Sequence, residues 1–257
     1  MGREFNLLII MELIMKKTLI ALMLGLSAAT APVAALAQSP AADSRQAGYV
    51  QPLTADNSLL LLVDLQDMFG MTISSIDQTN LVNNAAGIAK AAKVFNVPTI
   101  LASANAKSFA GPVFQQVTQA RPDLQVYDRT AINVWQDRRV VDLIKQSGRK
   151  KIIIGGLWTA SCVMLPALSA LGEGYEVYIL SDVTGDITPD SQNNAMQRLV
   201  QAGATPINWV ALMLEWQQDW SRKATAGGVL QIARDHGAAW GMGARYAGAM
   251  KVGSEAK

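Results

Sequence analysis

The sequence predicts a single α/β domain of Rossmann-like type, with three layers in which helices cover both faces of a central, mainly parallel sheet. Short continuous apolar runs recur along the chain, and such runs are typical of strands that are buried on both faces. Segments with helical spacing separate these runs, and this alternation is typical of parallel sheets. Hydrophobic residues make up 50% of the chain, which is enough for a large packed core.

Strands and helices are expected to alternate after residue 55. The strands are predicted at Leu59–Val63, Thr99–Ala102, Ile152–Ile154 and Val177–Leu180, and the helices at 80–95, 137–147, 162–172 and 190–202. In parallel sheets of this kind, ligands bind outside the carboxyl ends of the strands. The residues that follow each strand are therefore the candidates for function.

The N-terminal segment has the layout of a bacterial secretory signal. Two lysines after Met15 precede the apolar run Thr18–Leu26, and small residues follow up to Ala37, where cleavage is expected. The apolar run is shorter than the ~20 residues of a membrane-spanning helix, so no stable membrane anchor is expected after cleavage. Because Glu12 interrupts the apolar character upstream, we expect translation to start at Met15. Residues 1–37 thus predict a periplasmic or secreted protein.

The remaining 220 residues are predicted to form one domain with flanking segments. Residues 38–55 are small and polar and contain two prolines, so they are expected to form an N-terminal arm that is loosely ordered unless a partner subunit holds it. The pattern of alternating strands and helices occupies residues 56–222. The stretch from Glu215 to Trp240 is rich in Trp, Ala and Gly and is expected to lie outside this core, with 223–257 as a C-terminal helical extension.

Charge and histidine content exclude several classes of function. The formal charge is +2, and loss of residues 1–37 removes three basic and two acidic residues, which leaves about +1 and no basic cluster. Nucleic acid is therefore not an expected partner. The chain has one histidine, His236, so a Cys–His pair and a multi-histidine zinc site both lack material. We expect no metal and no cofactor.

Three polar residues follow or end predicted strands. Asp64 follows the first strand, Arg129 ends the segment Tyr127-Asp128-Arg129, and Cys162, the only cysteine, follows the strand at 152–154. A thiol in the first turn of a helix faces free N–H groups, which are expected to lower its pKa and favour the thiolate. Alternatively, Cys162 is a small buried apolar residue, Asp64 caps a turn, and Arg129 is a surface charge paired with Asp128.

The surroundings of these residues favour the first interpretation. The segments that matter are Leu62-Val63-Asp64-Leu65-Gln66, Val97-Pro98-Thr99-Ile100-Leu101, Gly155-Gly156-Leu157-Trp158-Thr159-Ala160-Ser161-Cys162-Val163, Pro166-Ala167-Leu168-Ser169-Ala170 and Glu215-Trp216-Gln217-Gln218-Asp219-Trp220, with Arg129, Asn133 and Trp135. In this order they resemble the isochorismatase-like cysteine hydrolases, and most closely the YcaC-type branch, over roughly residues 50–222.

The resemblance implies a catalytic set of Asp64 as proton acceptor, Arg129 as the basic residue and Cys162 as nucleophile. The family commonly has lysine in place of Arg129, and an arginine with its pKa above about 12 acts only as a fixed charge and donor. Lys107 is the alternative source of a titratable amine.

The resemblance also implies a surround for the reacting centre. Backbone N–H groups near Ser161 and Cys162 would form the oxyanion hole, and a cis peptide is expected at Trp158–Thr159. The side chains expected to bind substrate or shape its pocket are Trp158, Thr159, Ser161, Asn133, Trp135 and Phe69.

The function implied is cleavage of an amide, an imide or a related C–N bond in a small molecule, through a thioester-like intermediate. The alternative is a catalytically idle member that serves as a binding or assembly module. Thiol redox chemistry lacks a second, resolving cysteine. The absence of histidine near Asp64 counts against nicotinamide as substrate, since related nicotinamidases hold a metal there. Because YcaC-type proteins form rings, a homo-oligomer is also implied.

Overall fold

The computed structural model describes residues 51–255, with side chains described through residue 250. The predicted signal segment and most of the predicted N-terminal arm lie outside these residues. Six parallel strands form one sheet in the order β3-β2-β1-β4-β5-β6. They are β1 (Ser58–Val63), β2 (Thr99–Ala104), β3 (Val126–Arg129), β4 (Lys151–Leu157), β5 (Glu176–Gly185) and β6 (Thr205–Ile207). The predicted α/β class with a parallel sheet is confirmed. The short edge strand β6 was not predicted, because three residues around Pro206 give no apolar run.

The strand order places a topological switch point between β1 and β4. The chain leaves β1 for β2 and β3 on one side, and then returns to β4, β5 and β6 on the other side. Connections from β1 and β4 therefore diverge at the carboxyl edge of the sheet, where such folds hold a crevice. The sheet geometry alone makes the residues after β1 and β4 neighbours.

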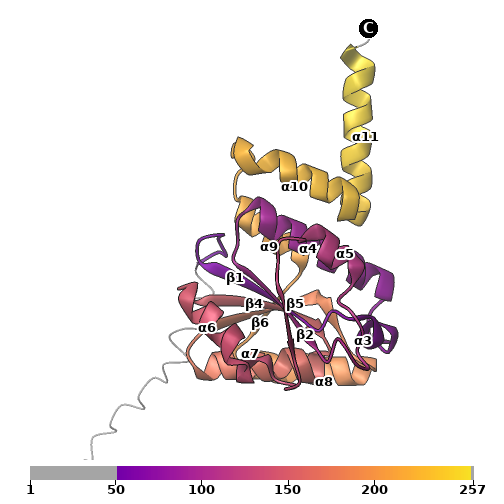
Figure 1. Ribbon diagram of the computed structural model, residues 1–257. Coiled ribbons are helices and arrows are strands. Elements are labelled where there is room, and N and C mark those ends of the chain that lie inside the picture. The colour runs from indigo at the N-terminus through magenta and orange to yellow at the C-terminus, as the bar shows by residue number, and fades with distance from the viewer. Residues whose placement is uncertain (1–50, 256–257) are drawn as a thin grey trace, which may run out of the picture. The chain divides into compact units, whose positions relative to one another are not determined.

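Helices cover both faces of the sheet, as Figure 1 shows. Alternate residues of β1 explain the two layers: Leu60 and Leu62 belong to one buried cluster, and Leu59, Leu61 and Val63 belong to the other. The first cluster includes residues of α3 (Asp67–Met71), α4 (Gln78–Val94), α5 (Gln115–Ala120), α9 (Trp209–Gln217) and α10 (Lys223–His236). The second includes residues of η1 (Val134–Gln136), α6 (Arg138–Gln146), η2 (Thr159–Val163), α7 (Met164–Gly172) and α8 (Pro189–Ala202).

The segment after the sheet is more closely integrated than the sequence predicts. Trp216, Val229 and Ile232 are buried in the same cluster as α4, and α10 packs on α4. The expectation that residues 215–240 lie outside the core was wrong for α9 and α10, because their apolar side chains cover α4. The last helix, α11 (Ala238–Glu255), contacts α10. None of the described helices is long and apolar enough to cross a membrane.

The part of the predicted arm that is described, residues 51–55, is held by the domain itself. Leu53 is buried, and its N–H donates to Glu215 Oε2 at 2.7 Å. Lys151 Nζ donates to the Gln51 carbonyl at 3.2 Å. This stretch is therefore anchored without a partner subunit.

Candidate active site

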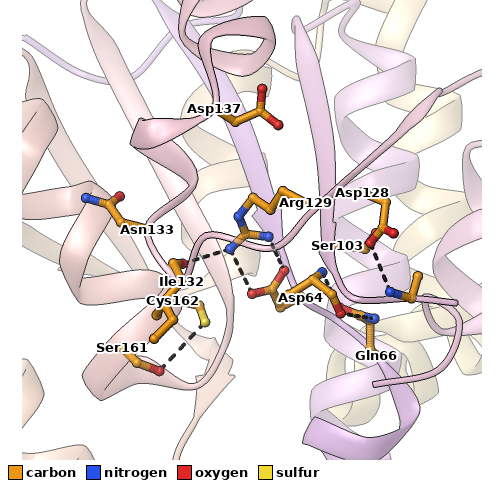
Figure 2. A network of polar contacts seen from close by, with 12 residues as sticks. Asp64, Gln66, Ser103, Asp128, Arg129, Ile132, Asn133, Asp137, Ser161 and Cys162 are labelled. Carbon is orange, nitrogen blue, oxygen red and sulfur yellow. Dashed lines mark hydrogen bonds and ion pairs between the residues drawn. The ribbon is translucent and has the colours of Figure 1, made fainter. Parts of the chain in front are cut away.

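The ends of three strands bring Asp64, Arg129 and Cys162 together, as Figure 2 shows. Asp64 follows β1, Arg129 is the last residue of β3, and Cys162 lies in the turn η2 that follows β4. Because β2 separates β3 from β1, the Arg129 side chain must cross two strand spacings of about 4.8 Å each to reach Asp64. Only a long cationic side chain can do this, which explains the residue type.

Asp64 and Arg129 form a sealed, two-point ion pair. Arg129 Nη1 lies 2.6 Å from Asp64 Oδ1 and Nη2 lies 2.9 Å from Oδ2, with side chains only 3% and 0% exposed respectively. Nη2 also donates to the Ile132 carbonyl at 2.9 Å. Arg129 Nε is buried without a hydrogen-bond partner among the described residues. Both terminal nitrogens are committed to Asp64, so the guanidinium fixes the orientation of the carboxylate.

The backbone at Asp64 is held in a left-handed conformation with φ of +53°. This region is uncommon for residues other than glycine and is found most often at functional sites. The Asp64 N–H donates to the Ala102 carbonyl at 2.9 Å, and the Asp64 carbonyl accepts from the Gln66 N–H at 2.8 Å. On the other side, β4 approaches so closely that a Cβ at Gly156 would lie 1.9 Å from the Val63 carbonyl oxygen. Glycine at 156 is thus required for the close approach beside Asp64.

Burial raises the pKa of Asp64 above its ordinary value. The hydrogen bonds and charge of Arg129 and a hydrogen bond from Cys162 act in the opposite direction, and the charge of Asp128 adds to the increase. A carboxylate whose neutral form is favoured in this way can hold a proton transiently, which is what a proton acceptor in catalysis needs.

Cys162 is buried, with 5% of its surface exposed, and faces the carboxylate. Burial, followed by the charge of Asp64 and a hydrogen bond to it, raises the pKa of Cys162 to about 12. Ser161 Oγ donates to the sulfur at 3.7 Å and, like Arg129, favours the thiolate, but more weakly. The expectation of a lowered thiol pKa was therefore wrong, because desolvation and a facing carboxylate outweigh the start of the helix. At neutral pH this raised pKa favours the thiol form of the sulfur.

The turn that holds Cys162 is wider than an α-helical turn. Residues Thr159–Val163 form a π-helical turn that leads into α7, and the N–H groups of Ser161 and Val163 both donate to the Trp158 carbonyl at 3.2 Å. The Ser161 N–H is thus already engaged, in contrast to its expected role as an oxyanion donor. The cis peptide is Leu157–Trp158, one bond earlier than predicted, because β4 extends to Leu157 and the turn begins there.

Phe69 and Trp158 lie together beside this turn. Their rings meet edge to face at 5.1 Å between centroids, and Trp158 Nε1 donates to the Phe69 carbonyl at 3.2 Å. Phe109, in the loop after β2, packs edge-on against Phe69 at 6.4 Å and is largely exposed. An aromatic row thus extends from the turn before Cys162 to the surface, and Phe109 is a member that sequence reasoning missed.

Other expected pocket residues make contacts within the protein. Thr159 is buried, and its hydroxyl bonds to Thr184 Oγ1 at 2.6 Å and Gln192 Oε1 at 2.5 Å. Asn133 caps η1 through Oδ1 and donates from Nδ2 to Ser169 Oγ at 3.0 Å. Figure 2 shows its side chain directed away from the sulfur.

Trp135 and Lys107 are also placed apart from the reacting centre. The Trp135 indole donates to Glu173 Oε1 at 2.7 Å and packs on Tyr175, beyond the end of α7 that is distant from Cys162. Lys107 is exposed in the loop after β2, and the positive charge beside the thiol and the carboxylate is that of Arg129.

Two buried polar residues that support the site were not singled out from the sequence. The Gln66 side chain pairs with both backbone groups of Ala104 and donates to the Gly111 carbonyl at 2.6 Å, which fixes the loop after β2. Asp186, after β5, accepts the N–H of Ala160 at 2.7 Å. Gln66 lies within a segment that matches the family, whereas Asp186 occurs among ordinary turn residues and gives no local signal.

No group of three or more His, Cys, Asp or Glu side chains within the described range is arranged to hold a metal ion. The polar groups around Cys162 are instead those of the ion pair and of the turn itself.

Several known proteins are similar to this chain in sequence and in fold. Residues 58–210 match the family model described as the isochorismatase domain. The chain is 34% identical over 173 residues to the probable hydrolase YcaC of Escherichia coli, covering 67% of this chain and 83% of that protein. The crystal structure of E. coli YcaC, an octameric hydrolase of unknown specificity, superposes with a TM-score of 0.73 and 28% identity over 77% of this chain and 97% of that chain. YcaC from Pseudomonas aeruginosa, solved with hexane-2,5-diol and covalent acrylamide, gives a TM-score of 0.73 and 29% identity over 77% of this chain and 98% of that chain.

Proposed function

Since the chain belongs to the isochorismatase family of hydrolases, we propose that it cleaves an amide, an imide or a related C–N bond of a small molecule, with Cys162 as nucleophile. The observation that supports this most directly is the sealed Asp64–Arg129 pair facing the only cysteine of the chain. A buried ion pair adds little to the free energy of unfolding, because the cost of removing two charges from water offsets most of their attraction. Its position against a thiol gives it a chemical use.

The proposed reaction begins with proton transfer from the Cys162 thiol to Asp64. Each carboxylate oxygen keeps a free lone pair after binding Arg129, so Asp64 can accept the proton while the ion-pair geometry is kept. The sulfur attacks the carbonyl carbon, and the nitrogen leaves with the proton from Asp64. Asp64 then takes a proton from water as the water oxygen attacks the thioester, and it passes that proton to the Cys162 sulfur as the acid is released.

The raised pKa values of both groups fit a transfer between them. Burial disfavours the charged form of either residue, so one proton and one negative charge are shared by the pair. Arg129 stabilises the negative charge on Asp64 and also on Cys162. For the oxyanion, the Cys162 N–H remains as the proposed donor, because the Ser161 N–H is engaged by Trp158 and the Ala160 N–H by Asp186.

The test uses acrylamide, which is both a small amide and a thiol-directed electrophile. The related P. aeruginosa YcaC was solved with covalent acrylamide, which supports the choice of probe. Intact-mass spectrometry should show one adduct on the wild-type protein and none on Cys162→Ala. A panel of small amides and imides should give products with the wild type only.

The result that would contradict the proposal is a protein without Cys162-dependent products or adducts at any pH. It would favour the alternative of a catalytically idle binding or assembly module. A Ser161→Ala variant, which keeps the thiol and loses only a weak donor, is the matched control for folding.

We also propose that the protein forms a homo-oligomer. The octameric state of E. coli YcaC supports this, and so does an exposed apolar stripe on α11, where Met242, Tyr246 and Met250 recur every four residues on one helix face. Light scattering should give the mass of a multimer, and Tyr246→Glu should reduce it if a second copy covers the stripe.

Finally, we propose export to the periplasm or medium, with cleavage after Ala37. The layout of residues 15–37 supports it. N-terminal sequencing of the protein from cell fractions should find Gln38 as the first residue. A cytoplasmic protein that begins at Met15 would refute it.

A further inference from the structure

A buried carboxylate outside the catalytic set touches the turn that holds Cys162. Asp186 follows β5 directly and is 2% exposed. Its Oδ2 accepts the N–H of Ala160 at 2.7 Å. Its Oδ1 accepts the N–H of Ile187 at 2.8 Å and the hydroxyl of Ser191 at 2.9 Å. The two oxygens therefore serve different parts of the molecule: one holds the turn before Cys162, and the other holds the start of α8.

The backbone of Asp186 is fixed as firmly as its side chain. Its N–H donates to Ser75 Oγ at 2.8 Å, and its carbonyl accepts the N–H groups of Ser74 and Ser75 at 3.0 and 3.3 Å. Asp186 is thus anchored to the loop before α4 and to α8, which makes it a rigid point from which Oδ2 can hold Ala160. A carboxylate on a mobile loop could not do this.

The position of Ala160 explains why the contact matters. The first N–H groups of a helix have no partner within the helix, and how they are satisfied determines how the turn is wound. Here the Ser161 and Val163 N–H groups bind the Trp158 carbonyl, and the Ala160 N–H binds Asp186. With these donors fixed, the turn keeps its wide π-helical form and the Cys162 side chain faces Asp64.

We propose that Asp186 is a positioning residue for Cys162, whose Oδ2 holds the Ala160 N–H so that the thiol stays aligned with Asp64. The inference rests on the proposed cysteine chemistry. The negative charge of Asp186 does not help a thiolate or an oxyanion, so it is the acceptor geometry that is useful. A displacement of about 1 Å at a reacting atom can reduce the rate about 100-fold.

The test compares Asp186→Ala and Asp186→Asn with the wild type, and measures Cys162 alkylation by iodoacetamide as a function of pH. Alkylation reports the thiolate fraction and needs no substrate. If Cys162 swings away from Asp64 in Asp186→Ala, the contributions of Asp64 that raise the thiol pKa weaken, and the alkylation midpoint falls toward the ordinary value of a thiol. Turnover should fall about 10- to 100-fold in kcat with little change in KM.

Asp186→Asn separates hydrogen bonding from charge. The asparagine side chain has one acceptor oxygen, which can bind either the Ala160 N–H or the Ile187 N–H. We therefore expect an alkylation midpoint between those of the wild type and Asp186→Ala. If charge alone mattered, both variants would shift the midpoint equally, and the proposal would be wrong. Because Asn is close to Asp in size, Asp186→Asn keeps the proposal testable if Asp186→Ala fails to fold.

Two control variants remove similar contacts that do not reach the turn. Asp182, which lies on β5, accepts the Trp209 N–H at 2.9 Å, and the Ser191 hydroxyl donates to Oδ1 of Asp186 and not to Oδ2. Asp182→Ala and Ser191→Ala should lower the melting temperature without moving the alkylation midpoint. If the alkylation midpoint is also unchanged in Asp186→Ala, Asp186 has only a structural role and the proposal is wrong. Because alkylation is independent of turnover, failure to find a substrate would count against the proposed function and leave this test intact.

Discussion

Two buried ion pairs lie at opposite ends of the sheet. At the amino end, Lys151 and Glu176 are register partners at the starts of β4 and β5, with Nζ 2.9 Å from Oε2. At the carboxyl end, Asp64 and Arg129 come from β1 and β3, which are not adjacent. The first pair leaves Glu176 20% exposed, and Lys151 also holds the Gln51 carbonyl. The second is sealed, has an Arg129 Nε without a partner in the described part of the chain, and has a left-handed backbone at Asp64.

The difference separates a structural pair from the pair that we propose to take part in catalysis. Lys151 and Glu176 lie in regular strand geometry; Glu176 keeps access to water, and Lys151 holds the chain before β1. Asp64 has a left-handed backbone, which stability alone would not select, and its ion pair with Arg129 faces a thiol. At the carboxyl end, a left-handed backbone at Asp64 and a buried Arg129 Nε without a partner in the described residues therefore occur together beside a thiol.

The largest expected effect comes from Asp64→Asn, which should move two properties of Cys162 in opposite directions. Turnover should fall about 10³-fold or more, because the proton acceptor is lost. Alkylation by iodoacetamide at pH 9 should become faster, because burial remains but the Asp64 charge and hydrogen bond no longer raise the thiol pKa. Rates of both reactions, with Asp128→Asn as the matched control, test this. Slower alkylation in Asp64→Asn would mean that Asp64 activates the resting thiol.

Arg129→Met and Lys151→Met compare the two pairs directly by urea unfolding. Arg129→Met should lower the free energy of unfolding by about 3–5 kcal/mol, since it leaves a fully buried carboxylate without its cation. Lys151→Met should cost about 1–2 kcal/mol, because Glu176 reaches water.

The pH dependence of Arg129→Met has a definite sign. Burial raises the pKa of Asp64 and Arg129 opposes this, so without Arg129 the folded state favours the protonated acid more strongly. Stability that is present below the ordinary value of 3.8 is then lost as pH rises through the folded pKa. The deficit of Arg129→Met should therefore shrink toward pH 4. A constant deficit from pH 4 to 8 would contradict the assignment.

A third contact, which is half-buried and lies between two helices rather than at an end of the sheet, provides a comparison near neutral pH. Lys90 Nζ and His236 Nε2 lie 2.8 Å apart between α4 and α10, and burial followed by the charge of Lys90 lowers the pKa of His236, with Asp235 opposing. A lowered histidine pKa gives stability that is present above 6.5 and is lost as pH falls through the folded value. We expect a loss of about 1 kcal/mol, measured by thermal unfolding between pH 7.5 and 5. His236→Gln, which cannot titrate, should remove this slope, and a slope that persists would have another origin.

The smallest effect is expected from Trp135→Phe. It removes the bond to Glu173 but keeps the aromatic contact with Tyr175, so the free energy of unfolding should change by about 0.5–1.5 kcal/mol. Turnover and the alkylation midpoint should not change, whereas Phe69→Leu, in the aromatic row beside Cys162, should alter turnover. A loss of turnover in Trp135→Phe would mean that Trp135 lines the substrate pocket, as the sequence predicts.

Several elements could be predicted from the sequence because their signals are local. The runs around 59–63 and 152–154 are apolar without alternation, which only strands buried on both faces explain, and the structure has β1 and β4 there. The edge strand β6 and the burial of Trp216 and Val229 against α4 have no such local pattern, since they depend on which helix lies opposite.

For the site, the sequence by itself determined the family, the parallel fold and the three strand ends at which Asp64, Arg129 and Cys162 stand. The fold follows from the order and periodicity of the apolar runs, and the family follows from the resemblance of the segments around these residues. The tertiary structure alone decided the protonation chemistry and the supporting contacts. The thiol pKa depends on desolvation and on a carboxylate 98 positions away in the chain, and the position of Asp186 against Ala160 depends on β5 lying beside β4. Dielectric and distance are properties of the packed molecule, so no local pattern in the chain encodes them.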